Sequence, residues 1–188
     1  MPMSRLQNDW QQDLKTSGRL FMTKVLPVLS RRFKGSFFSM EKTQPSELES
    51  RFDQDAGIDI WYAHIHGKMR GIASRIQEIE HGRRPYDTFT IRTERCSGTK
   101  TKFEKRLEAI NNDWLYSHYQ LQAYFRVETH QLLSFAICIT KKLFELAVDK
   151  NLAYEQTNGV DKNKFVVVPW SAFSDGDIQF VELLAEII

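Results

Sequence analysis

The segment that most constrains the fold of this chain reads QDAGIDIWYAHIHGKMRGIASRIQ. Two stretches within it, residues 58–65 and 69–77, are rich in the β-branched and aromatic residues that favour strands. Only a short turn around Gly67 separates them, and strands joined by a short turn pair antiparallel. The sequence therefore predicts a β-hairpin whose first strand carries Asp59 and whose second strand carries Arg75.

Hydrophobic periodicity predicts alternating helices and strands along the rest of the chain. Residues 8–33 are typical of one or two amphipathic helices broken near Pro27, and a short helix is predicted to begin at Ser46 and to end at Gly57. Further elements are expected as strands at residues 88–95, 119–127, 132–139 and 165–168, and as helices at residues 100–112, at residues 141–148 and from residue 177. This order indicates a single α/β domain with a central mixed sheet flanked by helices. We expect residues 1–45 to form an N-terminal helical segment packed on a core of residues 46–188, which a C-terminal helix closes.

Composition limits the class of protein. The chain has 188 residues, of which 41% are hydrophobic and 27% charged, as in an ordinary globular domain. No apolar run is long enough to span a bilayer, and residues 1–14 lack the apolar core of a signal peptide. The two cysteines, Cys96 and Cys138, do not form a disulfide framework. We therefore expect a cytoplasmic protein that does not associate with membranes.

Charge is distributed unevenly, although the net charge is only +2. Residues 1–45 have eight Lys or Arg against three acids, and residues 64–106 have eleven against five. Between them, residues 46–63 have one Arg against five acids. An acidic segment between two basic ones suits an enzyme in which carboxylates hold a cation and basic residues hold a phosphate backbone. Chance variation of surface charge over windows of this length is the alternative interpretation.

The predicted hairpin resembles part of the PD-(D/E)XK, or restriction-endonuclease-like, nuclease superfamily. AGIDIW is similar to that superfamily's first metal-binding strand, which makes Asp59 the metal ligand, and RGIASRIQ lies where the superfamily has its Glu-x-Lys motif. Glu47 and Glu49 lie on the preceding helix, where many members have another acid, and FVVVPWS resembles a late strand of these proteins. The resemblance covers residues 46–173, and it implies a restriction-endonuclease-like core and metal-dependent hydrolysis of phosphodiesters.

The resemblance assigns roles to individual residues, with one departure. Asp59 and Arg75 would be catalytic, and a Mg²⁺ or Mn²⁺ ion would activate water and offset charge in the transition state. Alignment of the second strand places Ala73 at the acid position and Arg75 at the lysine position, and an alanine cannot bind a metal. The metal ligands expected are therefore Asp59 with Glu47, Glu49 and Glu94, and Glu78 is another acid that could replace the missing one. Alternatively, Asp59 is structural and caps a turn or pairs with Arg75.

Basic residues after the hairpin predict a surface for nucleic acid. The candidates for phosphate contacts are Arg83, Arg84, Arg92, Arg95, Lys102 and Lys105. Ordinary solvated helix and strand faces are the alternative interpretation. His64 and His66 have a spacing that suits Zn²⁺, but they lie opposite Asp59 in strand parity and would not join its site.

Two functions from different classes are open at this point. The first is a nucleic-acid-binding protein that is also a Mg²⁺-dependent DNA or RNA nuclease. The second is a catalytically inactive nuclease-fold protein that binds nucleic acid or another protein, such as one encoded by a phage or mobile element for defence or counter-defence. The apolar pattern of residues 178–188 also allows a homodimer contact.

Overall fold

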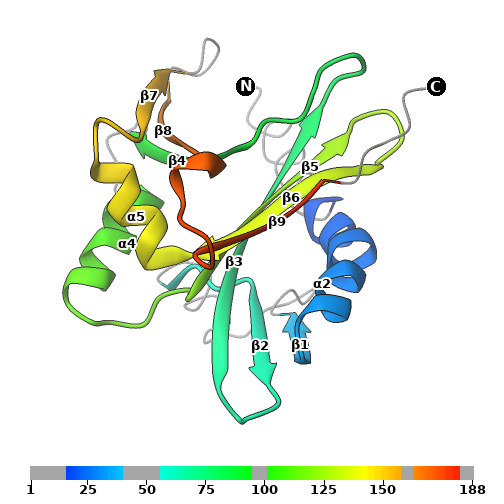
Figure 1. Ribbon diagram of the computed structural model, residues 1–188, viewed down its shortest axis with the longest axis horizontal. Coiled ribbons are helices and arrows are strands. Elements are labelled where there is room, and N and C mark those ends of the chain that lie inside the picture. Colours follow the sequence, from blue (N-terminus) through cyan, green and yellow to red (C-terminus); the bar gives the residue numbers. More distant parts are fainter. Residues whose placement is uncertain (1–15, 40–55, 95–100, 158–162, 183–188) are drawn as a thin grey trace, which may run out of the picture.

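The computed structural model is an α/β fold with two β-sheets (Figure 1). It describes residues 16–39, 56–94, 101–157 and 163–182. The larger sheet contains β1 (Gly35–Ser39), β2 (Ile60–His64), β3 (Met69–Ile79), β5 (Tyr119–Arg126), β6 (Leu132–Ile139) and β9 (Ile178–Glu182). The smaller sheet contains β4 (Thr88–Glu94), β7 (Tyr154–Thr157) and β8 (Lys164–Pro169). The helical elements are η1 (Phe21–Val25), α2 (Leu26–Arg32), α4 (Lys102–Asn111), α5 (Thr140–Val148) and η3 (Trp170–Ala172).

The larger sheet is mixed, with the strand order β1-β2-β3-β5-β6-β9. Only β3 and β5 are parallel neighbours, whereas the other adjacent pairs are antiparallel. Parallel pairing needs a long connection, which β4 and α4 provide between β3 and β5. β6 is buried along its length except at its last residue, as expected for an apolar strand covered on both faces.

One face of the larger sheet is covered by η1 and α2. The π-helical η1 ends at Val25, two residues before Pro27, which is the second residue of α2. A proline ring clashes with the carbonyl four residues before it, and a wider turn at this point accommodates the ring. The buried helical side chains that pack on the sheet are Leu20, Phe21, Val25 and Leu29.

The opposite face carries α4, α5 and the smaller sheet, whose strand order is β4-β8-β7 (Figure 1). Helix α4 begins with a capping box, in which Thr101 Oγ1 accepts from the Glu104 amide and Glu104 Oε2 accepts from the Thr101 amide. Phe103 of this helix stacks on Phe144 of α5 at a centroid separation of 5.4 Å. The two helices therefore share one apolar cluster with the smaller sheet.

Side chains of the larger sheet bind the free edge of the smaller one. Among the described strands, β4 pairs with β8 alone, so its other edge presents backbone groups that no strand pairs with. Arg75 Nη1 donates to the Thr90 carbonyl at 2.9 Å, and Gln122 Oε1 accepts from the Thr90 amide at 2.9 Å. The Tyr124 hydroxyl donates to the Thr88 carbonyl at 2.7 Å. This row of three polar side chains joins the two sheets.

The predicted α/β class and mixed central sheet are confirmed. The strand predicted at residues 132–139 has the observed bounds, but the strand at residue 88 belongs to the second sheet rather than to the central one. The predicted C-terminal helix is wrong over residues 178–182, which form β9 against β6, because pairing with an available strand edge overrides a weak helical pattern. β1 and β7 were not predicted. The restriction-endonuclease-like core stays a prediction.

Candidate nucleic-acid interface

The β2–β3 hairpin forms as predicted. Its strands are antiparallel, with Ile60 opposite Ile72 and Ala63 opposite Met69. The turn closes through a hydrogen bond from the Gly67 amide to the His64 carbonyl at 2.9 Å. Gly67 has a φ of +78°, a conformation that glycine adopts without strain. The prediction that the Asp59 and Arg75 segments lie on adjacent antiparallel strands is therefore confirmed.

Asp59 lies immediately before β2 and bonds to β3 through its side chain. Its Oδ2 accepts hydrogen bonds from the Ser74 amide at 2.5 Å and from the Ser74 hydroxyl at 3.1 Å. The ladder between β2 and β3 ends at Ile60 and Ile72, so β2 does not provide an acceptor for the Ser74 amide. The Asp59 carboxylate thus continues the hydrogen bonding of β3 beyond the end of its partner strand.

Arg106 of α4 interacts electrostatically with the same carboxylate. Its Nη1 donates to the Ala56 carbonyl, and the residue is 5% exposed. Burial lowers the pKa of the Arg106 guanidinium to about 10, and the negative charge of Asp59 acts in the opposite direction. Gly57 has a φ of +54°, and a Cβ atom there would collide with the guanidinium. Arg106 is therefore packed tightly against the backbone of Ala56 and Gly57, just before Asp59 in the chain.

Arg75 faces the other sheet. Ser74 and Arg75 are consecutive on β3, so their side chains point to opposite faces. The Arg75 guanidinium bonds to Thr90 and lies 5.4 Å from the ring centre of Phe165, and Arg92 lies 5.6 Å from the same ring. Burial lowers the pKa of Arg75, and the positive charge of Arg92 lowers it further. The structure therefore brings Arg75 together with Arg92, and it gives Asp59 and Arg75 different hydrogen-bond partners.

The predicted metal ligands are only partly within the described residues. Glu47 and Glu49 lie outside them. Glu94 is at the end of β4, where its Oε2 is 2.6 Å from Lys164 Nζ. Across the described ranges, no group of three or more His, Cys, Asp or Glu side chains is placed to hold a metal ion. The Mg²⁺ or Mn²⁺ site stays a prediction.

The predicted phosphate-binding residues are spread over several elements. Arg83 and Arg84 are exposed in the β3–β4 loop, and Arg92 is on β4. Lys102 and Lys105 are on α4, and Arg95 lies outside the described residues. Figure 1 shows the β3–β4 loop at the top of the view and α4 at the lower left. The described members of this set therefore do not form one compact patch.

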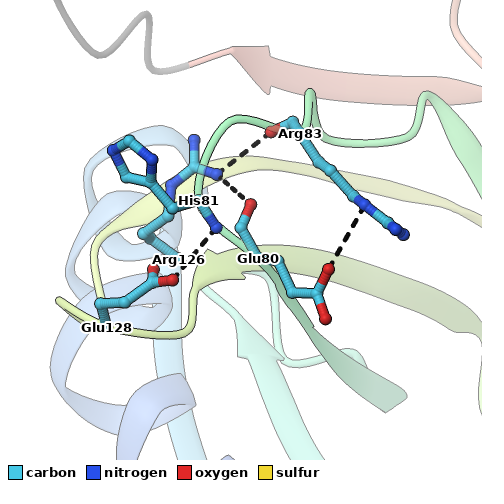
Figure 2. Close-up of polar contacts among 5 residues, drawn as sticks. All are labelled: Glu80, His81, Arg83, Arg126 and Glu128. Carbon is cyan, nitrogen blue, oxygen red and sulfur yellow. Dashed lines mark hydrogen bonds and ion pairs between the residues drawn. The ribbon is translucent and has the colours of Figure 1, made fainter.

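The β3–β4 loop itself is held in place by the last residue of β5 and by the β5–β6 connection (Figure 2). Arg126 Nη1 donates to the carbonyls of Glu80 at 2.6 Å and Arg83 at 3.1 Å, and the His81 amide donates to Glu128 Oε1 at 3.1 Å. The Arg83 side chain lies 3.4 Å from Glu80 Oε2, so its charge is partly offset. These contacts support a structural role for the loop.

A different group of basic residues lines a groove at the other end of the larger sheet. The groove has a volume of about 550 Å³. Its wall is the end of α2 and the segment after it, and its floor is one face of the β2–β3 hairpin with the start of β5. The cationic and imidazole residues are Arg32, Lys34, His64, His66, Lys68 and Arg70, and the aromatic residues are Phe33, Tyr62 and Tyr119. None of these lining residues is an acid.

Among the described residues, no carboxylate neutralises the groove cations. In the part of the chain that the structure describes, Arg32, Lys34, Lys68 and Arg70 form no ion pairs. Arg70 donates to the Tyr119 hydroxyl and also lies 5.5 Å from the centre of its ring. The groove therefore concentrates positive charge on a surface of fixed geometry.

Sequence reasoning missed this groove. The two basic segments were recognised, but the contact between them depends on β1, which pairs with β2 and brings Lys34 beside Ile65. The available signal was the alternation of Lys68 and Arg70 with His64 and His66 on one face of the predicted hairpin.

Comparison with known proteins does not assign a function. No protein-family model, curated protein or solved structure matches the chain. Across the described ranges, the helices are too short or too polar to cross a membrane.

Proposed function

We propose that this protein binds nucleic acid and that the groove between α2 and the β2–β3 hairpin holds the phosphate backbone. The observation that carries the proposal is the gathering of Arg32, Lys34, Lys68 and Arg70 around one groove without an acid in its lining. Unpaired cations placed together attract a polyanion and release its counterions on binding, which is the main source of affinity for nucleic acid.

The environment of the aromatic residues favours contacts with phosphate over contacts with bases. Tyr62 is 4% exposed, and its hydroxyl donates to the Lys34 carbonyl at 3.0 Å. Tyr119 is already covered on one side by Arg70. A base needs an open ring face for stacking, which the buried Tyr62 does not offer. We therefore expect binding with little sequence preference.

Binding without hydrolysis is the better supported form of this function. Ala73 stands where the resembled superfamily has an acid, and the Asp59 carboxylate accepts two hydrogen bonds from Ser74. Metal-dependent cleavage is the second candidate, and the antiparallel hairpin that places Asp59 beside β3 favours it. In that case Asp59 would hold Mg²⁺ or Mn²⁺, with Arg75 at the phosphate.

The test is a fluorescence-anisotropy titration of labelled single-stranded and duplex DNA and RNA. Salt is varied from about 50 to about 300 mM, because the slope of log affinity against log salt reports the number of phosphates neutralised. Four cations predict a slope of about −2.8 on a single strand, and the variant Lys34→Gln/Lys68→Gln should reduce it to about −1.4. Parallel incubations with Mn²⁺ would reveal cleavage of the same substrates.

The matched control is Lys141→Gln/Lys150→Gln, which removes the same charge from exposed positions on and after α5. Its slope should equal that of the native protein. Absence of binding at low salt, or an equal reduction of the salt slope in both double variants, would refute the groove as the binding site. Cleavage by the native protein that is lost in Asp59→Asn would favour the nuclease function instead.

A further inference from the structure

The face of the β2–β3 hairpin that points away from the groove is apolar at its tip. Ile65 and Met69 flank the turn and are 63% and 55% exposed. Met69 is opposite Ala63 in the strand register, and strand alternation puts Ala63, Ile65 and Met69 on the face opposite Tyr62 and Arg70. The tip is therefore a narrow ribbon with cations on one face and two exposed apolar side chains on the other.

We propose that this tip acts as a wedge that inserts Ile65 and Met69 between neighbouring bases of a duplex while the groove holds an adjacent phosphate backbone. Proteins that distort duplexes insert Ile, Leu, Met or Phe between base steps, and a two-stranded ribbon is narrow enough to enter a DNA groove. The partner is a duplex whose stacking is already weakened, such as one with a mismatch or a nick. This inference rests on the proposed function.

The geometry of the hairpin suits a wedge. Figure 1 shows the turn between β2 and β3 as the lowest point of the view, beyond the end of β1. The Ile65 amide donates to the Lys34 carbonyl at 3.4 Å, and the ladder of β1 with β2 begins at Gly35 and His64. This pairing fixes the apolar tip relative to Lys34, so a held backbone and an inserted side chain keep a constant spacing.

Charge complementarity favours nucleic acid over other occupants of the tip. Lys68 is in the turn between Ile65 and Met69, and Arg70 follows on the opposite face of the ribbon, so a partner that surrounds the tip meets both the apolar pair and these cations. A phosphate backbone satisfies those cations on both sides of an opened base step. A second copy of the chain would bring the same positive charges together and repel itself.

The test uses duplexes with 2-aminopurine placed beside a mismatch, beside a nick, or within an intact helix. This base analogue brightens when it is unstacked, so insertion is read directly. We expect the native protein to raise its fluorescence severalfold at the weakened steps. It should also bind them about tenfold more tightly than intact duplex, because less stacking has to be broken there, and tenfold corresponds to about 1.4 kcal/mol. Ile65→Ser/Met69→Ser should abolish both effects and leave the salt slope on single strands unchanged.

The matched control is Val148→Ser/Leu152→Ser, which removes two other exposed apolar side chains and should behave as the native protein. If the native protein binds without changing the 2-aminopurine fluorescence, or if Ile65→Ser/Met69→Ser changes it equally, the wedge proposal is refuted and the proposed function still stands. A native dimer in light scattering that dissociates in the tip variant would also overturn it, because the apolar pair would then be a self-contact. Absence of all binding would instead refute the proposed function.

Discussion

Replacement of Gln122 by leucine should loosen the junction between the two sheets. Gln122 is 1% exposed on β5, and its Oε1 accepts from the Thr90 amide at 2.9 Å. Its Nε2 donates to the Tyr124 hydroxyl at 2.7 Å. Leucine has a similar size but leaves the Thr90 amide without this acceptor at the free edge of β4.

The cost can be assessed from these contacts. A buried amide without an acceptor costs about 1–3 kcal/mol, and loss of the bond to Tyr124 costs about 1 kcal/mol. Leucine recovers part of this because it avoids burying a polar amide. We expect a net loss of about 2 kcal/mol, which lowers the melting temperature by about 4–8 °C in a domain of this size.

Urea unfolding and amide exchange measure the effect. Gln122→Leu should lower the urea midpoint without changing the slope, and the Thr90 amide should exchange faster. Gln120→Leu is the matched control, because Gln120 is on the same face of β5 and its side-chain amide makes no hydrogen bond within the described residues. Equal stability of Gln122→Leu and the native protein, or equal destabilisation by both substitutions, would refute the idea that this side chain joins the sheets.

Two further predictions concern the hairpin and its surroundings. Asp59→Ala should destabilise the protein by about 1–3 kcal/mol in EDTA, because the Ser74 amide loses its acceptor. If the variant is as stable as the native protein in EDTA, and Mg²⁺ or Mn²⁺ raises the melting temperature of the native protein alone, Asp59 would instead be a metal ligand. The pKa of His118 is lowered from 6.5, first by burial and then by Arg70, so the unfolded chain binds more protons and stability should rise with pH up to about 6.5. His118→Gln should flatten that rise in urea titrations at several pH values, and identical slopes would contradict this origin.

Local patterns predicted the hairpin because its determinants are close in sequence. The strand alternation on both sides of Gly67 specified pairing, and the apolar run at Leu132–Ile139 specified a buried strand. The sequence predicted Asp59 on the first strand, and the structure places it one residue before that strand begins at Ile60. The residues around it were only partly predictable, because Arg106, whose pKa its charge influences, comes from α4 across a long separation in sequence.

Pairing between strands that are distant in sequence determined β9 and the groove, which local sequence patterns did not predict. Residues 178–182 have both a helical and a strand pattern, and the open edge of β6 selected the strand. The groove was hidden in the same way, because Lys34 and Lys68 belong to separate basic segments that meet only when β1 pairs with β2. Likewise, Arg75 was visible as a cation on a strand, but the Thr90 carbonyl that it binds is on another sheet.

The sequence by itself determined the α/β class, the β2–β3 hairpin and the alternation of cationic and apolar residues along it, because these depend on neighbours within a few positions. Only the tertiary structure decided which side chains meet. In the folded protein, Asp59 accepts hydrogen bonds from Ser74, and Arg75 donates to the edge of the second sheet. The cations of two distant segments line one groove. The physical reason is that these contacts depend on which strands pair at each sheet edge and which elements cover each sheet face. Those partners are distant in sequence, so local propensity does not encode them.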